Sequence, residues 1–444
     1  MTLNKKRIFI IVFLGSIFLI TRFQNILTDF NYINGDARDR YYPLAVNLAA
    51  GNGFSLQNQP PYLPDDFNQP GYPFFVALIY WVTNGSHMVV AIMQCLLELL
   101  IIIITLKLAD KFGLSKSKIA LVAFFATISP FIAFFTNMLL TEVLATFAAM
   151  LLCYLLVLGA ENKSFIVWAA AAIIGGLCLL IRPDMLVSVL LMAFAACAIL
   201  IITFKLPAVP NILLFFVIFA LVMTPWTLRN YNLTGKIQPL GRVTEQTDLG
   251  YVKWLNTWLV EPKDIPIFWW QRMELKIPLN QAATESFSGD KERVEELLRI
   301  AQFQNSFEGE TSAEFARLSE ETYSRRPVKS YLIVPFERSA LTLIRMPDYI
   351  ESDVYQSLTY SLWLPFIVLA LLGMIAMSVQ KIFLIPIALL IGRIFLPFYT
   401  ALGAEPRYII ESLPIFYITA AAGAFWLFNH IQALGQADKN KHKN

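Results

Sequence analysis

Ten apolar stretches of 13 to 22 residues set the main constraint on the fold of this chain. A helix of about 20 residues crosses the roughly 30 Å hydrocarbon layer of a bilayer, and the shorter stretches reach that length with flanking residues. The chain is 57% apolar and 15% charged, whereas soluble chains are about 45–50% apolar and about 25% charged. The sequence therefore predicts an all-α polytopic membrane protein with about ten transmembrane helices. Their expected ranges are 8–20, 88–106, 119–135, 138–158, 164–181, 185–204, 211–228, 358–379, 382–402 and 408–429.

The lysines indicate how these helices cross the membrane. Lys5-Lys6-Arg7 precede the first apolar stretch, and cytoplasmic segments carry an excess of Lys and Arg, so the N-terminus is expected in the cytoplasm. A cleaved signal peptide is the alternative, but no small-residue cleavage site follows Ile20. Ten helices also place the C-terminus in the cytoplasm, in a multi-pass protein of the cytoplasmic (inner) membrane. The lysines of the short connections and the tail then share one side: Lys107, Lys111, Lys116, Lys118, Lys163, Lys205, Lys381, Lys439, Lys441 and Lys443.

The spacing of the apolar stretches divides the chain into three parts. Residues 1–230 form an N-terminal transmembrane module, and its first outer loop, 21–87, is expected to be catalytic. Residues 231–356 form an extracytoplasmic segment between helices 7 and 8. Residues 357–444 form a C-terminal transmembrane module with a short basic cytoplasmic tail.

The extracytoplasmic segment is expected to be mostly helical. Lys291–Ile300 and Ala313–Tyr323 carry apolar residues three and four positions apart, a spacing that predicts short amphipathic helices. In the first loop, Pro73–Val82 is apolar but too short to span the membrane, so it is expected to be an interfacial helix. Four tryptophans are expected at the membrane interface or at the rim of a cavity: Trp254, Trp258, Trp269 and Trp270.

Charged groups from five separate loops fall on the outer side in this topology. Charges near the hydrocarbon layer are costly and usually face a cavity, so they predict a functional site on the extracytoplasmic side. These groups are Asp36 with its loop, Glu142, Arg182-Pro183-Asp184, Arg229-Asn230 and Glu405-Pro406-Arg407-Tyr408. Within the spans, Gln94 and Glu98 are expected to form a buried polar pair between helices, and Arg393 is expected to face the interior.

The composition excludes several other classes of protein. The four cysteines lie in apolar stretches and predict no disulfide framework, and the three histidines show no zinc-site spacing. No Walker or dinucleotide-binding motif is present, so ATP-driven transport by this chain alone is not expected. The net charge of +3 comes from 35 basic and 32 acidic residues, a balance that does not suggest nucleic acid as a partner.

Several short motifs follow one another in a characteristic order. They are Gly35-Asp36 with Tyr41-Tyr42, Gly51-Asn52-Gly53, Pro70-Gly71-Tyr72-Pro73, Leu139-Leu140-Thr141-Glu142, Gly176-Leu177 with Arg182-Pro183, Pro225-Trp226 with Arg229-Asn230, and Arg407-Tyr408. In this order they resemble the GT-C superfamily of glycosyltransferases. Within it, the chain is most similar to the branch of dolichyl-phosphate-mannose–protein mannosyltransferases and bacterial aminoarabinose transferases. The resemblance covers nearly the whole length.

This resemblance implies an inverting glycosyltransferase that uses a sugar on a polyprenyl phosphate outside the cytoplasmic membrane. It implies that the aspartate of the first loop, Asp36, is the catalytic base. Many members have a second acidic residue directly after it, whereas this chain has Ala37 and reaches its next acid at Asp39. No cofactor is certain, and a divalent metal is possible. The expected partners are membrane lipids, the lipid-linked sugar donor, and an acceptor that is a glycan, a lipid or a protein.

The chemistry of sugar transfer assigns a role to each candidate. A base must take the proton of the acceptor hydroxyl, which is the role of Asp36; the alternative is that Asp36 caps the helix after it. Cationic groups must stabilise the departing phosphate, and arginine matches its oxygens. The arginine candidates are Arg182, Arg229 and Arg407, with snorkelling to headgroups as their alternative. Three further residues are expected to bind substrate: Glu142, Tyr408 and Asp39, where Asp39 alternatively pairs with Arg38 or Arg40 and Glu142 has a buried hydrogen-bonding role as its alternative.

Two other functions are compatible with this composition. A flippase or transporter of lipid-linked sugars would place polar residues at mid-membrane in symmetry-related helices, but here they gather at the outer surface and no inverted repeat is evident. A noncatalytic membrane scaffold would not need Asp36 together with several arginines on one side. The transferase is therefore the favoured prediction.

Overall fold

The computed structural model describes residues 13–22, 40–241, 249–260, 291–304, 309–344, 353–399 and 406–441. Within these ranges the chain forms helices and turns but no strand, so the predicted all-α polytopic class is confirmed. The chain divides into two compact units. Unit 1 comprises Met1–Gly241, Ser357–Gly392 and Ile410–Asn444, and unit 2 comprises Arg242–Gln356 and Arg393–Ile409.

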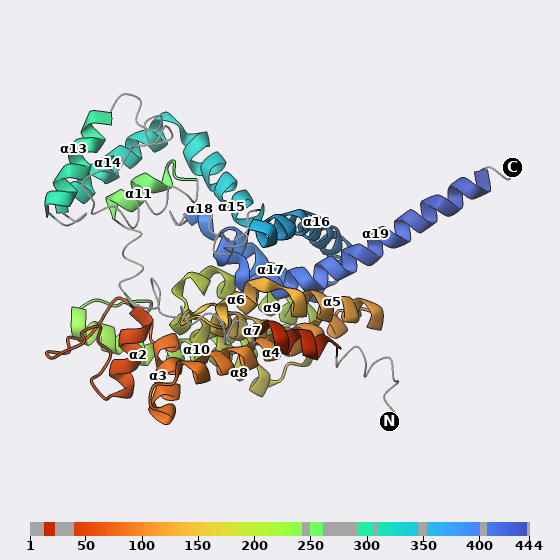
Figure 1. Cartoon of the computed structure of the whole chain (residues 1–444), viewed down its shortest axis with the longest axis horizontal. Helices are drawn as coiled ribbons and strands as arrows, with labels where there is room; N and C mark the ends of the chain where they lie inside the picture. The colour runs from red at the N-terminus through yellow and green to blue at the C-terminus, as the bar shows by residue number, and fades with distance from the viewer. Residues whose placement is uncertain are drawn as a thin grey trace. The chain divides into compact units, whose positions relative to one another are not determined.

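Unit 1 consists mainly of long apolar helices (Figure 1). Its elements include α2 (Tyr42–Ala49), α3 (Gly71–Thr83), α4 (His87–Lys111), α5 (Lys116–Ile128), α6 (Pro130–Phe135), α7 (Glu142–Asn162), α8 (Phe165–Ile181), η2 (Pro183–Met185), α9 (Leu186–Phe204), α10 (Val209–Thr234) and α19 (Leu413–Lys441). Three more elements, α16 (Asp353–Met377), α17 (Leu384–Ile394) and η9 (Pro406–Ser412), have residues in both units.

In the described part of the chain, six helices are long and apolar enough to cross a membrane. They are His87–Lys111, Lys116–Phe135, Glu142–Asn162, Pro183–Phe204, Val209–Thr234 and Arg407–Gln436. Shorter apolar helices occupy Phe13–Arg22, Gly71–Thr83, Phe165–Ile181 and Ser361–Met377. The α3 helix, with 13 residues, coincides with the short stretch expected to be interfacial.

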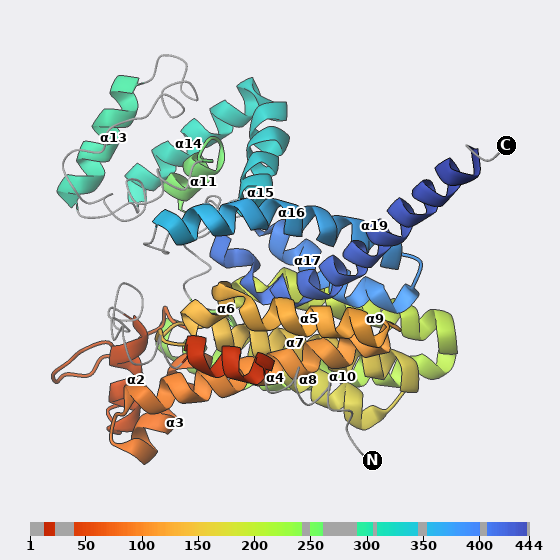
Figure 2. The ribbon, with the colours of Figure 1, turned by 45° about the vertical axis from the view of Figure 1, so that its right-hand side comes forward.

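Helix α7 lies at the centre of unit 1. It packs against α4, α8 and α9, and α8 packs in turn against α10, as the turned view in Figure 2 also shows. Small residues allow the close approach of α8 and α10, because a Cβ atom on Gly176 would lie 2.6 Å from a methyl group of Val222. Close contact through glycine is the usual way in which apolar helices associate in a membrane.

Prolines interrupt two of the predicted spans. Because Pro130 has no N–H group and disfavours a helical residue before it, α5 ends at Ile128 and Ser129 is extended before α6 begins. The predicted span 382–402 is not one helix: α17 ends at Ile394, and a short helix α18 (Leu396–Tyr399) follows. Pro397 explains this end, since a proline in a continuing helix would clash with the carbonyl of Arg393.

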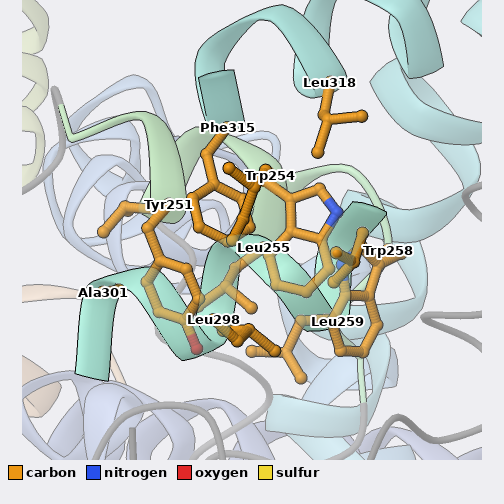
Figure 3. Packing of buried hydrophobic residues seen from close by; sticks show 12 residues of the cluster. Tyr251, Trp254, Leu255, Trp258, Leu259, Leu298, Ala301, Phe315 and Leu318 are labelled. Carbon is orange, nitrogen blue, oxygen red and sulfur yellow. The ribbon is translucent and has the colours of Figure 1, made fainter. Parts of the chain in front are cut away.

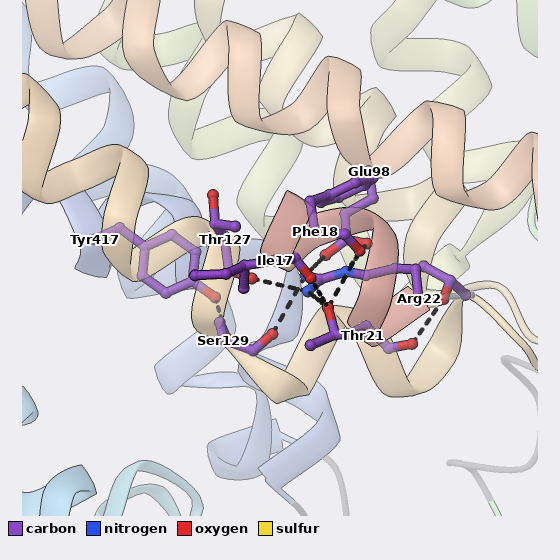
Figure 4. Close-up of polar contacts among 10 residues, drawn as sticks. Ile17, Phe18, Thr21, Arg22, Glu98, Thr127, Ser129 and Tyr417 are labelled. Carbon is purple, nitrogen blue, oxygen red and sulfur yellow. Dashed lines mark hydrogen bonds and ion pairs between the residues drawn. The ribbon is translucent and has the colours of Figure 1, made fainter. Parts of the chain in front are cut away.

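A buried ion pair fills the break between α5 and α6 (Figure 4). Arg22 donates from Nε to Glu98 at 3.0 Å and from Nη1 to the carbonyl of Thr127 at 2.8 Å, one of the carbonyls near the break. Tyr417 of α19 donates to the Ser129 hydroxyl at 2.7 Å. Gln94 and Glu98 are both buried, as expected, but they bond to different partners instead of forming one pair.

Unit 2 has its own aromatic core, with elements α11 (Gly250–Asn256), α13 (Lys291–Gln304), α14 (Gly309–Arg325), η7 (Lys329–Ile333) and α15 (Val334–Ile344). The two predicted amphipathic helices are confirmed as α13 and α14. The rings of Trp254 and Trp258 lie 5.2 Å apart and pack with Tyr251 and Phe315 (Figure 3). The prediction of an interfacial belt is therefore wrong for Trp254 and Trp258, which are 0% and 4% exposed. Trp269 and Trp270 lie outside the described residues.

Candidate active site

Arg182 occupies its position because a proline follows it. The residue before a proline is disfavoured in the helical region, so α8 ends at Ile181 and Arg182 is extended, with φ −141° and ψ 110°. The chain then turns through η2, which places Asp184 beside the guanidinium group. Arg182 donates from Nε to Asp184 Oδ1 at 3.1 Å and from Nη2 to Oδ2 at 2.9 Å, which is a bidentate ion pair.

Two further carboxylates reach the remaining nitrogen of Arg182. Its Nη1 lies 3.1 Å from Oε1 of Glu142 and 3.3 Å from Oε1 of Glu411, and both glutamates are buried. Glu142 is the first residue of α7, where the positive end of the helix dipole stabilises a negative charge. One guanidinium therefore faces three carboxylates, which gives the cluster a formal charge of −2 when all are ionised. We call Glu142, Arg182, Asp184 and Glu411 the carboxylate cluster.

Glu411 was not among the sequence candidates. It lies in η9, within the apolar range 408–429 that was predicted to be a span. An ionisable residue inside an apolar span is by itself a signal of function or of a buried partner. That signal was present in the sequence, but its partner is more than two hundred residues away and becomes evident only in the structure.

The end of the polar first loop packs directly beside this cluster. A Cβ atom on Gly71 would lie 2.7 Å from the carbonyl oxygen of Leu180 and 2.9 Å from the nitrogen of Ile181, so only glycine fits there without a shift. The next residue, Tyr72, donates its hydroxyl proton to Gln94 at 3.0 Å. Gln94 in turn donates to the carbonyls of Thr136 and Met138, which lead into α7 and Glu142.

A substitution at Gly71 should separate this motif from α8. Because the added methyl group would meet backbone atoms, Gly71→Ala should cost about 1–3 kcal/mol of stability and shift Arg182. Gly15→Ala is the matched control, since nothing lies within 4 Å of a Cβ at that helical position. We expect Gly71→Ala to melt at a lower temperature than the wild type in detergent, and Gly15→Ala to melt at the same temperature as the wild type. Equal melting temperatures for the two variants would contradict the close packing.

A second basic position joins the loop to α10. The guanidinium carbon of Arg229 lies 4.6 Å from the ring centre of Trp226 and 5.3 Å from that of Phe54. Its Nη1 donates to Asn230 at 3.0 Å. The side chain is half-buried, and within the described part of the chain it donates no other hydrogen bond. Phe54 and Trp226 share an apolar cluster against which Leu180 packs, so this group borders the chain segment that carries Arg182.

The structure thus brings together only part of the predicted set. Glu142 and Arg182 meet in the carboxylate cluster, and Arg229 lies in the neighbouring aromatic group. Arg407 lies in η9 within unit 2, with its guanidinium carbon 5.6 Å from the ring centre of Tyr408. Arg393 is buried as predicted and donates to the carbonyl of Tyr408 at 2.7 Å.

Two predicted residues, Asp36 and Asp39, lie outside the described residues. The chain that follows them is described. The guanidinium carbon of Arg40 lies 5.2 Å from the ring centre of Phe67, and Tyr41 packs edge-on against Tyr72 with ring centres 5.3 Å apart. The loop that contains Asp36 therefore leads directly into the contacts of Tyr72.

Metal binding was left open by the sequence. Within the residues that the structure describes, no group of three or more His, Cys, Asp and Glu side chains is arranged to hold a metal ion. In the carboxylate cluster the arginine takes the central place that a cation would need.

Comparisons with known proteins give matches only at the level of solved structures. No protein-family model matches the chain, and no curated protein matches it. The chain is similar to ArnT from Cupriavidus metallidurans bound to undecaprenyl phosphate, with 11% identity and a TM-score of 0.42 over 93% of this chain and 76% of that one. It is also similar to the apo state of ArnT, with 12% identity and a TM-score of 0.39 over the same shares.

Proposed function

We propose that this protein is an inverting glycosyltransferase that moves a sugar from a polyprenyl-phosphate donor to an acceptor hydroxyl on the outer side of the membrane. One observation supports this most strongly. In a mainly apolar helical unit, the Pro70-Gly71-Tyr72 motif of the first loop packs beside one arginine and three carboxylates, of which Arg182, Glu142 and Glu411 are buried. Buried charges in a membrane protein are costly, and ionisable residues within membrane-spanning segments usually mark functional sites.

The reaction that we propose is a single displacement at the anomeric carbon. The acceptor oxygen forms a bond to that carbon from one face while the bond to the phosphate oxygen breaks on the other face. The phosphate leaves with the bonding electron pair, and the Asp36 carboxylate takes the proton of the acceptor hydroxyl. The donor supplies the leaving group, so neither a nucleotide nor a covalent intermediate is needed.

The contacts of Arg182 and Arg229 suggest different roles for the two arginines. Arg182 has all three of its nitrogens engaged with carboxylates, so we assign it to holding the site in shape. Arg229 is held by rings on which its guanidinium stacks, while its remaining N–H groups stay able to bind phosphate oxygens. We assign Arg229 of unit 1 to the lipid phosphate, and Arg407 and Tyr408 of unit 2 keep the substrate-binding role predicted from the sequence. We assign Glu142 to binding of the acceptor.

Binding of undecaprenyl phosphate tests this assignment. A charge-assisted hydrogen bond contributes about 1.5–3 kcal/mol, so Arg229→Ala should weaken binding by about tenfold or more. Arg229→Lys should recover only part of the loss, since lysine keeps the charge but not the two-pronged geometry, and Arg407 variants should follow the same order. Native mass spectrometry of purified protein with added lipid gives the bound fraction.

Two controls accompany this measurement. Undecaprenol lacks the phosphate and should bind all variants equally weakly. Arg317→Ala removes an exposed arginine of α14 that is paired with Glu314, and it should bind like the wild type. If Arg229→Ala and Arg407→Ala both bound undecaprenyl phosphate as tightly as the wild type, the phosphate assignment would be wrong.

A further inference from the structure

One helical segment of unit 2 has its apolar and polar faces reversed. In η7 and the start of α15, the exposed residues are mainly large and apolar. They are Val328, Tyr331, Leu332, Ile333 and Phe336, each between 44% and 66% exposed. The buried residues of the same segment are mainly polar, and they include Ser330, Arg338, Ser339 and Thr342. We call the exposed set the apolar face.

Helices α13 and α14 of unit 2 follow the usual pattern for a water-facing surface. In α13, Val294, Leu297 and Leu298 are buried. In α14, Phe315 and Leu318 are buried while Arg317 and Glu320 are exposed. Polar outer faces, as on α13 and α14, are expected for a surface in contact with water, so the apolar face of η7 and α15 indicates a different environment.

The reversal has a structural cause on the buried side. Arg338, with no exposed surface, donates from Nη1 to the side chain of Asn256 at 2.8 Å and from Nη2 and Nε to the carbonyls of Asn256 and Leu259. These carbonyls lie at and just beyond the C-terminal end of α11, where a cation is favourable. Burial lowers the pKa of Arg338 to about 10, so it keeps its charge at neutral pH. Polar contacts therefore help to dock α15, whereas Phe336 and the apolar side chains of η7 stay exposed.

The residues around the apolar face fit a lipid surface. Arg325, Arg326 and Lys329 lie at its N-terminal edge, where cations can contact lipid phosphates. Tyr331 stacks on Tyr323 with ring centres 4.2 Å apart, and aromatic residues are enriched at the boundary between membrane and water. Soon after Ile344 the chain reaches the apolar helix Ser361–Met377, so the segment is tethered to a candidate span.

We propose that the apolar face is an interfacial membrane anchor that inserts into the headgroup region of the bilayer. The apolar side chains lie at the boundary of the acyl chains, and the basic edge binds lipid phosphates. This inference does not depend on the proposed transfer reaction. It gives unit 2 a fixed contact with the lipid surface besides its covalent connections.

Site-specific fluorescence on the full-length protein in phosphatidylcholine vesicles tests this proposal. The four native cysteines, Cys95, Cys153, Cys178 and Cys197, are replaced by alanine, and an environment-sensitive dye is attached at Leu332→Cys or Phe336→Cys. Val328→Cys serves as a second position on the same face if one of these variants fails to fold. Arg317→Cys on the polar outer face of α14 is the matched control.

Two quenchers report the environment of each dye. A doxyl-labelled phosphatidylcholine should remove most of the emission at positions 332 and 336 but little at 317, and aqueous iodide should give the reverse order. Iodide quenching at 332 and 336 as strong as at 317 would place the face in water and overturn the proposal. Protection from both quenchers would show that protein covers the face, which would overturn it equally.

Discussion

Asp36→Asn should lower the rate of sugar transfer by about 10²–10⁴-fold, the usual contribution of a general base. Asparagine keeps the size and hydrogen bonding of aspartate but cannot accept the proton of the acceptor hydroxyl. Folding should survive, since asparagine caps a helix about as well as aspartate. Donor binding should persist as well, because the removed negative charge does not hold an anionic phosphate. The measurement is transfer from a radiolabelled lipid-linked sugar by purified variants.

Asp39→Asn is the matched control for this prediction. It alters a carboxylate three residues away in the same loop and should cost much less activity. The yield of monodisperse protein in detergent shows whether either variant is misfolded. Wild-type rates for Asp36→Asn would remove it as the base. An equal loss in Asp39→Asn would instead indicate a pair of acids acting together or a shared metal ion.

Removal of Arg182 should have the largest effect on stability. Arg182→Gln would remove the guanidinium that pairs with the buried carboxylates of Glu142 and Glu411 and with the partly exposed carboxylate of Asp184. Breaking a buried ionic group by removing one partner typically costs about 3–5 kcal/mol. We expect a strongly reduced yield and melting temperature in detergent, together with loss of transfer. Arg182→Lys should recover part of the yield, since it restores the charge but not the bidentate bond to Asp184.

A second substitution separates the electrostatic effect from simple loss of packing. Arg182→Gln combined with Glu142→Gln removes one of the uncompensated charges and should be more stable than Arg182→Gln alone. Size-exclusion profiles and melting curves of the variants in one detergent give the comparison. If Arg182→Gln were as stable as the wild type yet inactive, Arg182 would act on substrate directly and not through the carboxylate cluster.

Local patterns were sufficient to predict most of the helices. The length and apolarity of the stretches identified α4, α7 and α10. The spacing of apolar residues by three and four positions identified α13 and α14. These signals are local because a helix in lipid must satisfy its own backbone and present apolar side chains along its length. Pro397 is also a local signal in the sequence, and it explains why the predicted span 382–402 ends early.

The pairing of charges could not be predicted in the same way. Arg22 meets Glu98 and the Thr127 carbonyl, and Arg182 meets Glu411, through contacts between segments far apart in the sequence. In the sequence alone, each of these charged residues is compatible with snorkelling to the headgroups or with a functional role. Trp254 was misassigned for a related reason, since an indole suits both a membrane interface and an aromatic core. Only the packing of α11 against α14 decides between them.

The most direct test of the transferase is whether the protein cleaves its donor. Purified protein in phosphatidylcholine vesicles is supplied with tritiated pentose and hexose donors on undecaprenyl phosphate and with a lipid and glycan extract as acceptor. The products are separated by chromatography. We expect free undecaprenyl phosphate to form at the same rate as labelled acceptor, and both rates to fall by about 10²–10⁴-fold with Asp36→Asn. Intact donor that the protein merely carries from one leaflet to the other would contradict it and identify a flippase instead.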